Sequence, residues 1–219
     1  MKRLNTYLFA ALVIAVFALT GCGAKKVVSP TPVPFGKGSL AVAGFTQPTN
    51  SWELLAGYLP EGHAQVAPEI LQQLDAALGA ALRQRGTTAY VSPAMVRQCE
   101  EIVSAEENSQ SRNSAWKHWL SVGRCQATDY LLIPQLISWT ERDGGEYGTL
   151  EPAAVVLDLY LLNLETGKLE GRYHFDETQY ALLENLLEAG KYFKRSGKWI
   201  SARQLAEEGI VEGLGELGL

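Results

Sequence analysis

The sequence contains few of the residues that carry most catalytic and metal chemistry. Its 219 residues include three histidines and three cysteines. None of His63, His118 and His174 stands at a metal-ligand spacing, and no cysteine lies within a few positions of any of them. P-loop, calcium-loop and G-x-S-x-G patterns are also missing. We therefore expect no metal, no cofactor and no enzymatic activity.

One glycine pattern near the end of the chain does match a nucleotide-binding motif by its letters. Gly213, Gly215 and Gly218 have the spacing G-x-G-x-x-G. A dinucleotide-binding turn follows a strand and opens a helix, whereas no predicted strand precedes these glycines. We interpret them as the glycine-rich end of a helix.

Basic residues are outnumbered by acidic ones. The chain has 19 Lys and Arg against 24 Asp and Glu, which gives a formal net charge of −5. A nucleic-acid partner requires a concentrated basic face that neutralises phosphates, so we expect none. With 47% hydrophobic and 20% charged residues, the chain is also unlike a collagen, a disordered tail or a multi-span membrane protein.

The apolar run at the start of the chain, Tyr7 to Leu19, is shorter than a typical transmembrane helix. Such a helix needs roughly 18–20 apolar residues to span the bilayer. Lys2 and Arg3 precede the run, and Leu19-Thr20-Gly21-Cys22 ends it. This order resembles the signal peptide and lipobox of bacterial lipoproteins. The alternative is an ordinary secretory signal with a chance cysteine.

The lipoprotein resemblance implies a location as well as an anchor. Cleavage would leave Cys22 as the acylated first residue, and its acyl chains would hold the protein on a membrane. In enterobacterial lipoproteins an aspartate after the cysteine retains the protein at the inner membrane. Gly23 occupies that position here, so the resemblance implies the outer membrane, with the domain in the periplasm.

Beyond the signal the chain divides into a tether and one domain. We expect a signal peptide over residues 1–21, the lipidated cysteine and a Pro/Gly-rich tether over 22–39, and a periplasmic domain over 40–219. Hydrophobic periodicity predicts the order β-α-β-α-α-β-β-β-α-α. The expected fold is α+β, a mixed sheet with helices packed on it. The expected strands are 40–45, 87–91, 129–141, 153–164 and 169–176, and the expected helices are 66–85, 93–103, 114–122, 179–189 and 201–217.

Two details of the expected strands bear on function. Pro134 lies inside the strand at 129–141, which implies an edge strand or a bulge. In the last strand, alternation puts Leu169, Tyr173 and Phe175 on a buried face and Glu170, Arg172, His174 and Asp176 on a wet one. Arg172 and Asp176 flank His174 there. A polar row on an exposed sheet face explains them as well as a site does.

The order of elements, the lipobox and two stretches of sequence resemble a known group. The stretches are Leu161–Lys168 (LLNLETGK) and Phe175–Gln179 (FDETQ). They resemble uncharacterised bacterial envelope lipoproteins related to CsgG, LpoB and the amino-terminal domain of TolB. The resemblance implies a non-enzymatic envelope domain that docks to partners. The segment Arg142–Pro152 is too short and polar to form the membrane-crossing hairpins of a CsgG pore, so we expect no pore.

Cys99 and Cys125 remain in the mature chain as an even pair in an oxidising compartment. A disulfide between them would close the polar segment between two helices. Two free, buried thiols are the alternative, because sequence alone does not show that the two backbones approach each other.

Basic and aromatic residues gather in one segment of this acidic chain, KYFKRSGKW at Lys191–Trp199. Its cations and aromatic side chains are typical of a contact with an anionic partner. The alternative is that Phe193 and Trp199 pack under the loop while the lysines face water. The candidate partner-binding residues are Lys191, Phe193, Lys194, Arg195, Lys198 and Trp199. The long loop Thr46–Gln65, with Trp52 and Tyr58, is a second candidate surface.

These observations favour a membrane-anchored, non-catalytic lipoprotein. We expect it to bind another envelope protein, in peptidoglycan synthesis or in secretion or surface assembly. The alternative is a structural subunit that self-assembles through its sheet edge into an oligomer or ring without a transmembrane barrel of its own.

Overall fold

The computed structural model describes residues 38–62, 64–106, 114–146, 148–179 and 195–219. All of them lie in one compact unit of the chain, Pro32–Leu219. The expected signal peptide, Cys22 and nearly all of the tether lie outside the described residues, as does all but the first residue of the helix expected at 179–189. Within the described ranges, no helix combines the length and apolar character needed to cross a membrane.

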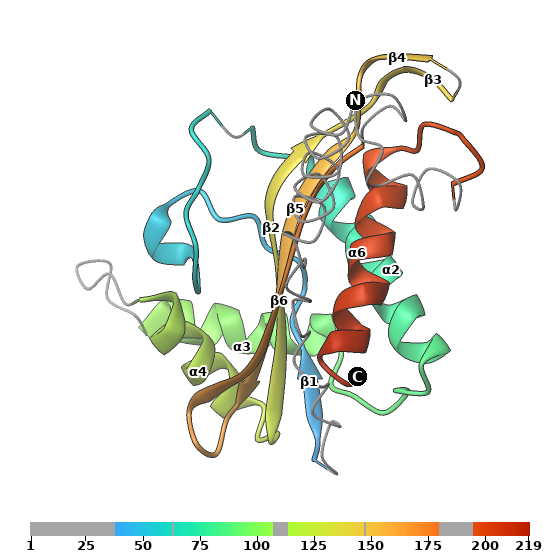
Figure 1. Cartoon of the computed structure of the whole chain (residues 1–219). Helices are drawn as coiled ribbons and strands as arrows, with labels where there is room; N and C mark the ends of the chain where they lie inside the picture. Colours follow the sequence, from blue (N-terminus) through green and yellow to red (C-terminus); the bar gives the residue numbers. More distant parts are fainter. Residues whose placement is uncertain (1–37, 63, 107–113, 147, 180–194) are drawn as a thin grey trace, which may run out of the picture. The chain divides into compact units, whose positions relative to one another are not determined.

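A mixed sheet of four strands forms the centre of the fold (Figure 1). Its order is β1 (Leu40–Val42), β2 (Tyr130–Thr140), β5 (Ala154–Asn163) and β6 (Lys168–Thr178). β1 is parallel to β2, whereas β2–β5 and β5–β6 are antiparallel. A separate hairpin of two short strands, β3 (Asp143–Gly145) and β4 (Gly148–Glu151), connects β2 to β5.

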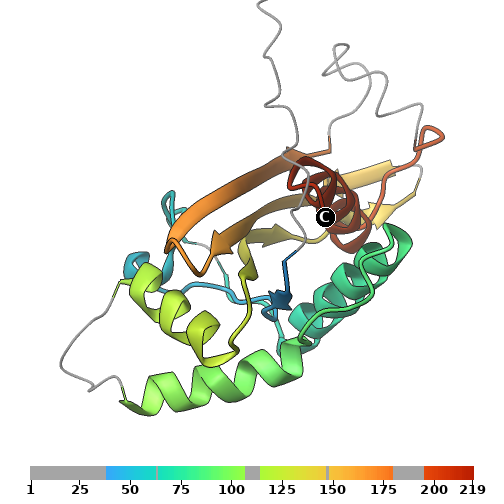
Figure 2. The same ribbon diagram turned by 90° about the horizontal axis from the view of Figure 1, so that it is seen from below.

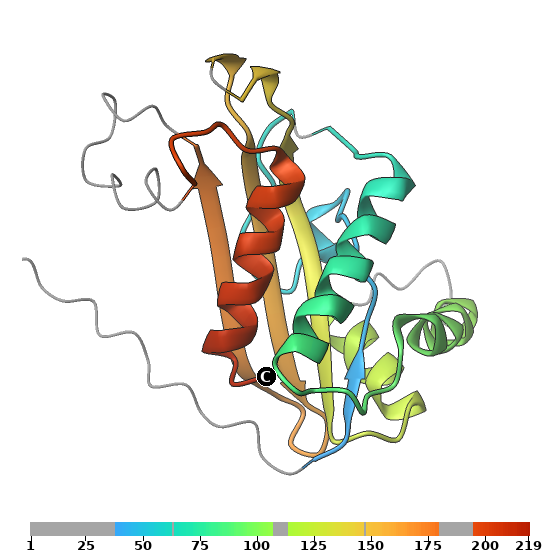
Figure 3. The ribbon, with the colours of Figure 1, turned by 90° about the vertical axis from the view of Figure 1, so that its right-hand side faces the viewer.

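Helices cover both faces of this sheet, as expected for an α+β fold (Figures 2 and 3). α2 (Pro68–Gln84) and α6 (Ala202–Glu216) pack on one face, and α3 (Pro93–Glu106) and α4 (Ala115–Cys125) pack on the other. The buried leucines of α2, Leu74, Leu78 and Leu82, recur every four residues, which places them on one side of the helix.

Two hydrophobic cores result, one on each face of the sheet. Successive side chains of a strand point to opposite faces, so β5 supplies both cores. Its Leu157, Leu159 and Leu161 belong to the core under α2 and α6. Tyr160 and Leu162 belong to the core under α3 and α4. Asp158 is a buried charged residue within this otherwise apolar strand.

Two expected elements differ from the observed ones. Thr87–Val91 is not a strand, and only Val91 forms a bridge, to Ala41. The reason is that β1 has only three residues. The Leu40 carbonyl and the Val42 amide of β1 both bond to Val91, so the pairing extends no further along Thr87–Val91. The segment expected as a polar loop at Arg142–Pro152 contains the β3–β4 hairpin.

Pro134 lies in an interior strand, and the nearest bulge of β2 falls between Leu136 and Ser138. The edge expected at Pro134 is therefore wrong, and the expected bulge lies just beyond it. The proline is tolerated because β1 has ended at Val42. The loop after β1 bonds to the Pro134 carbonyl and the Leu136 amide through Thr46, and so bypasses the proline nitrogen.

A second bulge corrects the expected faces of β6. Leu162 pairs with Leu169, but Leu161 pairs with Gly171, so Glu170 is an extra residue. The bulge shifts the alternation by one and puts Leu169 on the same face as Arg172. Beyond it the expected alternation holds, with Arg172, His174 and Asp176 opposite Tyr160, Asp158 and Val156.

Candidate functional site

The loop that follows β1 covers the part of the sheet that α3 and α4 leave open. It lies on the same side of the sheet as those two helices (Figures 1 and 2). Leu55 and Ala56 in this loop pack against the core under α3 and α4. The loop therefore stands directly above the polar residues of β5 and β6.

Buried side chains of the sheet fasten this loop at three points. Gln135 of β2 is 1% exposed, and its amide donates to the Glu53 carbonyl at 2.9 Å and accepts from the Leu55 amide at 3.3 Å. The Tyr160 hydroxyl oxygen lies 3.2 Å from the Ala56 carbonyl oxygen, and it shares its single proton between this carbonyl and the Asp158 carboxylate. Gln135 and Tyr160 thus reach polar groups of the loop backbone, as buried polar groups require.

The two ends of the loop are also held together. The Gln47 side chain donates to the Ala64 carbonyl at 3.0 Å and accepts from the Val66 amide at 2.7 Å. A short 3-10 helix, η1 (Ser51–Glu53), carries a capping box between Asn50 and Glu53. The segment Thr46–Gln65 is longer than the roughly 6–16 residues of an ordinary Ω-loop, but its ends are held close together in the same way, and we call it the Ω-loop.

A pocket of about 280 Å³ lies between the Ω-loop and the sheet. Ala56, Gly57, Tyr58 and Pro60 form its loop side. Ile137 and Val156 supply apolar surface from β2 and β5, and the polar lining is Asp158, Arg172, His174 and Asp176. We call this cavity the β6 pocket.

Asp158 is the centre of the polar lining, and it is 1% exposed. Its Oδ1 accepts from Arg172 Nε at 3.1 Å and lies 3.0 Å from His174 Nδ1. Its Oδ2 accepts from Arg172 Nη2 at 3.2 Å and from the Tyr160 hydroxyl at 3.1 Å. Three nitrogens and a hydroxyl that it shares with the Ala56 carbonyl therefore surround the carboxylate, which leaves it little further capacity to accept.

The ion pair shifts the protonation equilibria of its neighbours. Burial lowers the pKa of Arg172, but the hydrogen bonds and negative charge of Asp158 outweigh burial and hold that pKa above its ordinary value. Burial and then the charge of Asp158 raise the pKa of Tyr160. Arg172 therefore stays a cation and Tyr160 a neutral donor across the physiological range.

This arrangement is suited to holding a ligand. Because a carboxylate oxygen only accepts, His174 Nδ1 must carry the proton toward Asp158. Asp158 itself is fully engaged and orients Arg172 and His174. Within the described part of the chain, no group of three His, Cys, Asp or Glu side chains could hold a metal ion.

Exposed aromatic surface lies beside the pocket. Tyr58 is 80% exposed at the tip of the Ω-loop. An exposed tyrosine on a backbone that is held in place is typical of a contact surface, since its ring loses little conformational entropy on binding.

The residues of the basic segment that the structure describes make contacts within the protein. Arg195 has a side chain only 6% exposed, with Nη2 2.6 Å from Glu208 Oε2 and 3.5 Å from Glu177 Oε1. Lys198 Nζ lies 2.8 Å from Glu146 Oε2, and the Trp199 amide donates to the Glu146 carbonyl at 2.8 Å. These contacts attach residues 195–199 to β6, α6 and the β3–β4 hairpin. Lys191, Phe193 and Lys194 lie outside the described residues.

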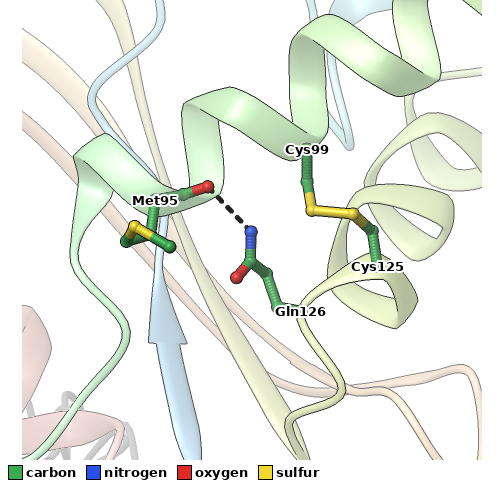
Figure 4. The surroundings of a disulfide bond; sticks show 4 residues. All are labelled: Met95, Cys99, Cys125 and Gln126. Carbon is green, nitrogen blue, oxygen red and sulfur yellow. Dashed lines mark hydrogen bonds between the residues drawn. A yellow bond between two sulfur atoms is a disulfide. The ribbon is translucent and has the colours of Figure 1, made fainter.

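A disulfide joins Cys99 of α3 to Cys125, the last residue of α4, with 5.9 Å between their Cα atoms (Figure 4). The sequence left this pairing open against two free thiols. Next to it the Gln126 side chain donates to the Met95 carbonyl at 2.9 Å (Figure 4). Both contacts hold the end of α4 against α3.

Sequence reasoning singled out Arg172, His174 and Asp176 but missed Asp158, Tyr160 and Gln135. A signal was present for Asp158, since it is the single charged residue in the strand AVVLDLYLLN. A charge inside such a run indicates a buried carboxylate that has partners. His63 lies outside the described residues, and His118 is on α4, away from the pocket residues in the fold.

Comparison with known proteins gives similarity of fold at low sequence identity. No protein family's sequence profile and no curated protein sequence matches the chain. The structure is similar to the PelC dodecamer from Paraburkholderia phytofirmans, with 12% identity, 86% of this chain and 92% of that chain covered, and a TM-score of 0.46.

Two further similar structures are smaller. For the LpoB C-terminal domain from Escherichia coli the identity is 15%, the covered shares are 65% of this chain and 83% of that chain, and the TM-score is 0.37. The lipoprotein GNA1162 from Neisseria meningitidis has 18% identity. The match covers 72% of this chain and 97% of that chain, with a TM-score of 0.37. LpoB, to which the sequence bears a resemblance, is thus among the structural neighbours.

Proposed function

We propose that this chain is a membrane-anchored periplasmic lipoprotein that acts as a non-catalytic docking module for another envelope protein. Its anchor would be the acylated Cys22, and its membrane the outer membrane. The order of basic start, short apolar run and lipobox supports this location. Peptidoglycan-synthesis and secretion or surface-assembly machinery are the candidate partners.

The observation that carries the docking role is the fastened Ω-loop, which holds Tyr58 at 80% exposure beside the β6 pocket. A surface that is already held in its bound conformation loses less entropy on association than a flexible loop does. We therefore assign docking to the Ω-loop tip and the adjoining polar face of β6.

A non-catalytic role fits the polar cluster of the pocket. A catalytic carboxylate needs free lone pairs for the proton that it moves, whereas four donors surround Asp158. The cluster therefore serves to position Arg172 and His174.

The basic segment stays part of the proposal as a second docking surface. Lys191, Phe193, Lys194, Lys198 and Trp199 are retained for it as predictions from the sequence. Arg195 has a structural role, because its guanidinium bridges Glu177 and Glu208.

Photocrosslinking in intact cells tests the docking role. A photoreactive phenylalanine analogue replaces Tyr58 in one strain and Lys194 in another. A third strain carries it at Val211, which is 46% exposed on α6 and serves as the matched control. We expect Tyr58 to yield a product with one other envelope protein and Val211 to yield none.

Two other outcomes would show which part of the docking proposal is wrong. A product at Lys194 alone would move docking to the basic segment. The absence of any product with another protein at Tyr58 and Lys194 would contradict the docking role.

Self-assembly is a second candidate function, and one feature of the sheet favours it. β6 has eleven residues and is an edge strand that, among the described residues, pairs only with β5. Unpaired edges are templates for pairing with another chain. A stable oligomer of the purified protein in light scattering would favour this function, and a monomer would contradict it.

A further inference from the structure

We propose that the β6 pocket binds the C-terminal carboxylate of a partner chain. This inference rests on the docking function proposed above and names the chemistry of the partner.

Asp158 bonds to some of the nitrogens of Arg172 and His174 and does not engage the others. It accepts from Nε and Nη2 of Arg172 and from Nδ1 of His174. The nitrogens that Asp158 does not engage are Nη1 of Arg172 and Nε2 of His174, and both residues line the pocket. Arg172 and His174 lie two residues apart on one face of β6, so each can offer a nitrogen to one oxygen of a carboxylate.

The charges of Asp158, Arg172, His174 and Asp176 leave the pocket without net positive charge even when His174 is protonated, so an anion is held by the individual donors, and one with a single charge is repelled less than one with two. Asp158 and Arg172 cancel each other, and a protonated His174 adds one positive charge. Asp176 lines the same pocket two residues further along β6, and its carboxylate repels added negative charge. A phosphate dianion is therefore less well matched than a carboxylate.

The apolar surface of the pocket favours a chain end over an acidic side chain. Ile137 and Val156 lie beside the donors, with Pro60 on the loop side. A space of about 280 Å³ is close to the lower limit of small-ligand pockets, roughly 300 Å³. An acidic side chain would bring only a few carbon atoms into it. A chain end brings a whole residue, whose small apolar side chain can lie against Ile137 and Val156.

The form of the His174 ring decides whether its Nε2 can donate to a carboxylate. With Nδ1 donating to Asp158, Nε2 of the neutral ring is an acceptor, and it donates only when the imidazole is protonated.

The test uses N-acetyl-alanyl-valine as the probe and the full-length protein in detergent micelles. NMR spectra are recorded with labelled arginine and histidine side chains while the probe is added. We expect saturable shifts of the Arg172 and His174 signals. The C-terminal amide of the same probe, N-acetyl-glutamic acid amide and inorganic phosphate are the comparison ligands, and we expect each to bind at least about tenfold more weakly.

Three variants separate the role of the pocket from that of folding. Arg172→Gln should weaken binding of the probe by about tenfold or more. Asp176→Asn changes an exposed carboxylate and should tighten binding by about two- to fivefold, because it removes the repulsion. Arg203→Gln on α6 removes an exposed arginine that pairs with Glu207, and this matched control should leave binding unchanged.

Several results would overturn the inference. They are equal binding of the acid and its amide, stronger binding of phosphate or of the glutamic acid amide, weaker binding by Asp176→Asn, or no shift at Arg172 and His174. If the probe does not bind while Tyr58 still crosslinks to an envelope protein, the carboxylate site is rejected and the docking function is retained. If the probe binds as described and no crosslink forms, the carboxylate site stands and docking fails.

Discussion

At the scale of single residues, Asp158 decides the character of the pocket. It is a buried charge in the middle of an apolar strand, and it is stable there because Arg172, Tyr160 and His174 all bond to it. The same bonds fix the positions of Arg172 and His174 on the edge strand. One buried carboxylate therefore links folding of the sheet to the shape of the site.

Asp158→Asn should lower the free energy of unfolding by about 2 kcal/mol, because the buried amide replaces an ionised acceptor of the Arg172 and Tyr160 hydrogen bonds. Unfolding in urea measures the effect. Asp176→Asn is the matched control, since this exposed residue shares the pocket, and we expect a change within about 0.5 kcal/mol. Equal effects of the two substitutions would show that Asp158 does not stabilise the fold through its partners.

At the scale of elements, two glycines allow α6 to lie close to β6. A Cβ atom at Gly209 would stand 2.7 Å from Cγ of Phe175, and one at Gly213 would stand 2.5 Å from Cδ1 of Tyr173. Real Cβ atoms do not approach so closely, so a larger residue at either position requires the neighbouring aromatic ring or the helix to shift. Part of the sequence that matches a nucleotide-binding motif is thus explained by helix–sheet packing.

Gly213→Ala should lower the free energy of unfolding by about 1 kcal/mol. Alanine gains about 1 kcal/mol over glycine within a helix, but overpacking costs about 1–3 kcal/mol. Gly215→Ala is the matched control on the same helix, because its Cβ would be 3.5 Å from the nearest atom, in Arg85. We expect the control to be neutral or stabilising in the same urea experiment. Stabilisation by both substitutions would refute the close approach of α6.

At the scale of the whole molecule, the sheet separates two cores, and each depends on residues far apart in sequence. The core under α2 and α6 unites the start of the described chain, such as Leu40, with its last residue, Leu219. The core under α3 and α4 is smaller and is reinforced by the Cys99–Cys125 disulfide. The disulfide acts on the whole molecule because it restricts the unfolded chain.

Reduction of the disulfide should lower the free energy of unfolding by about 3.5 kcal/mol, the loop-closure value for a sequence separation of 26. Unfolding in urea with and without reductant measures the loss. A Cys99→Ala, Cys125→Ala double variant should be equally destabilised and insensitive to reductant. Unchanged stability of the reduced wild-type chain would contradict the prediction.

Much of the architecture could be predicted from local pattern. The periodicities of two and of 3.6 residues located β2, β5 and β6 and the helices α2, α3, α4 and α6. Alternation also placed Arg172, His174 and Asp176 on one face of β6, because neighbouring positions on a strand are related by local geometry alone. The lipoprotein signal and Cys22 remain predictions of the same local kind.

The tertiary structure alone decided what those residues do. Asp158 meets His174 because β5 and β6 pair in one register, and register depends on the whole sheet and its bulges. The short β1 left Thr87–Val91 with a single bridge. Gln135 and Tyr160 found partners in an Ω-loop that is distant in sequence. The sequence by itself thus determined most of the elements and, beyond the bulge, the faces of β6, whereas the pocket required long-range pairing, which no local period encodes.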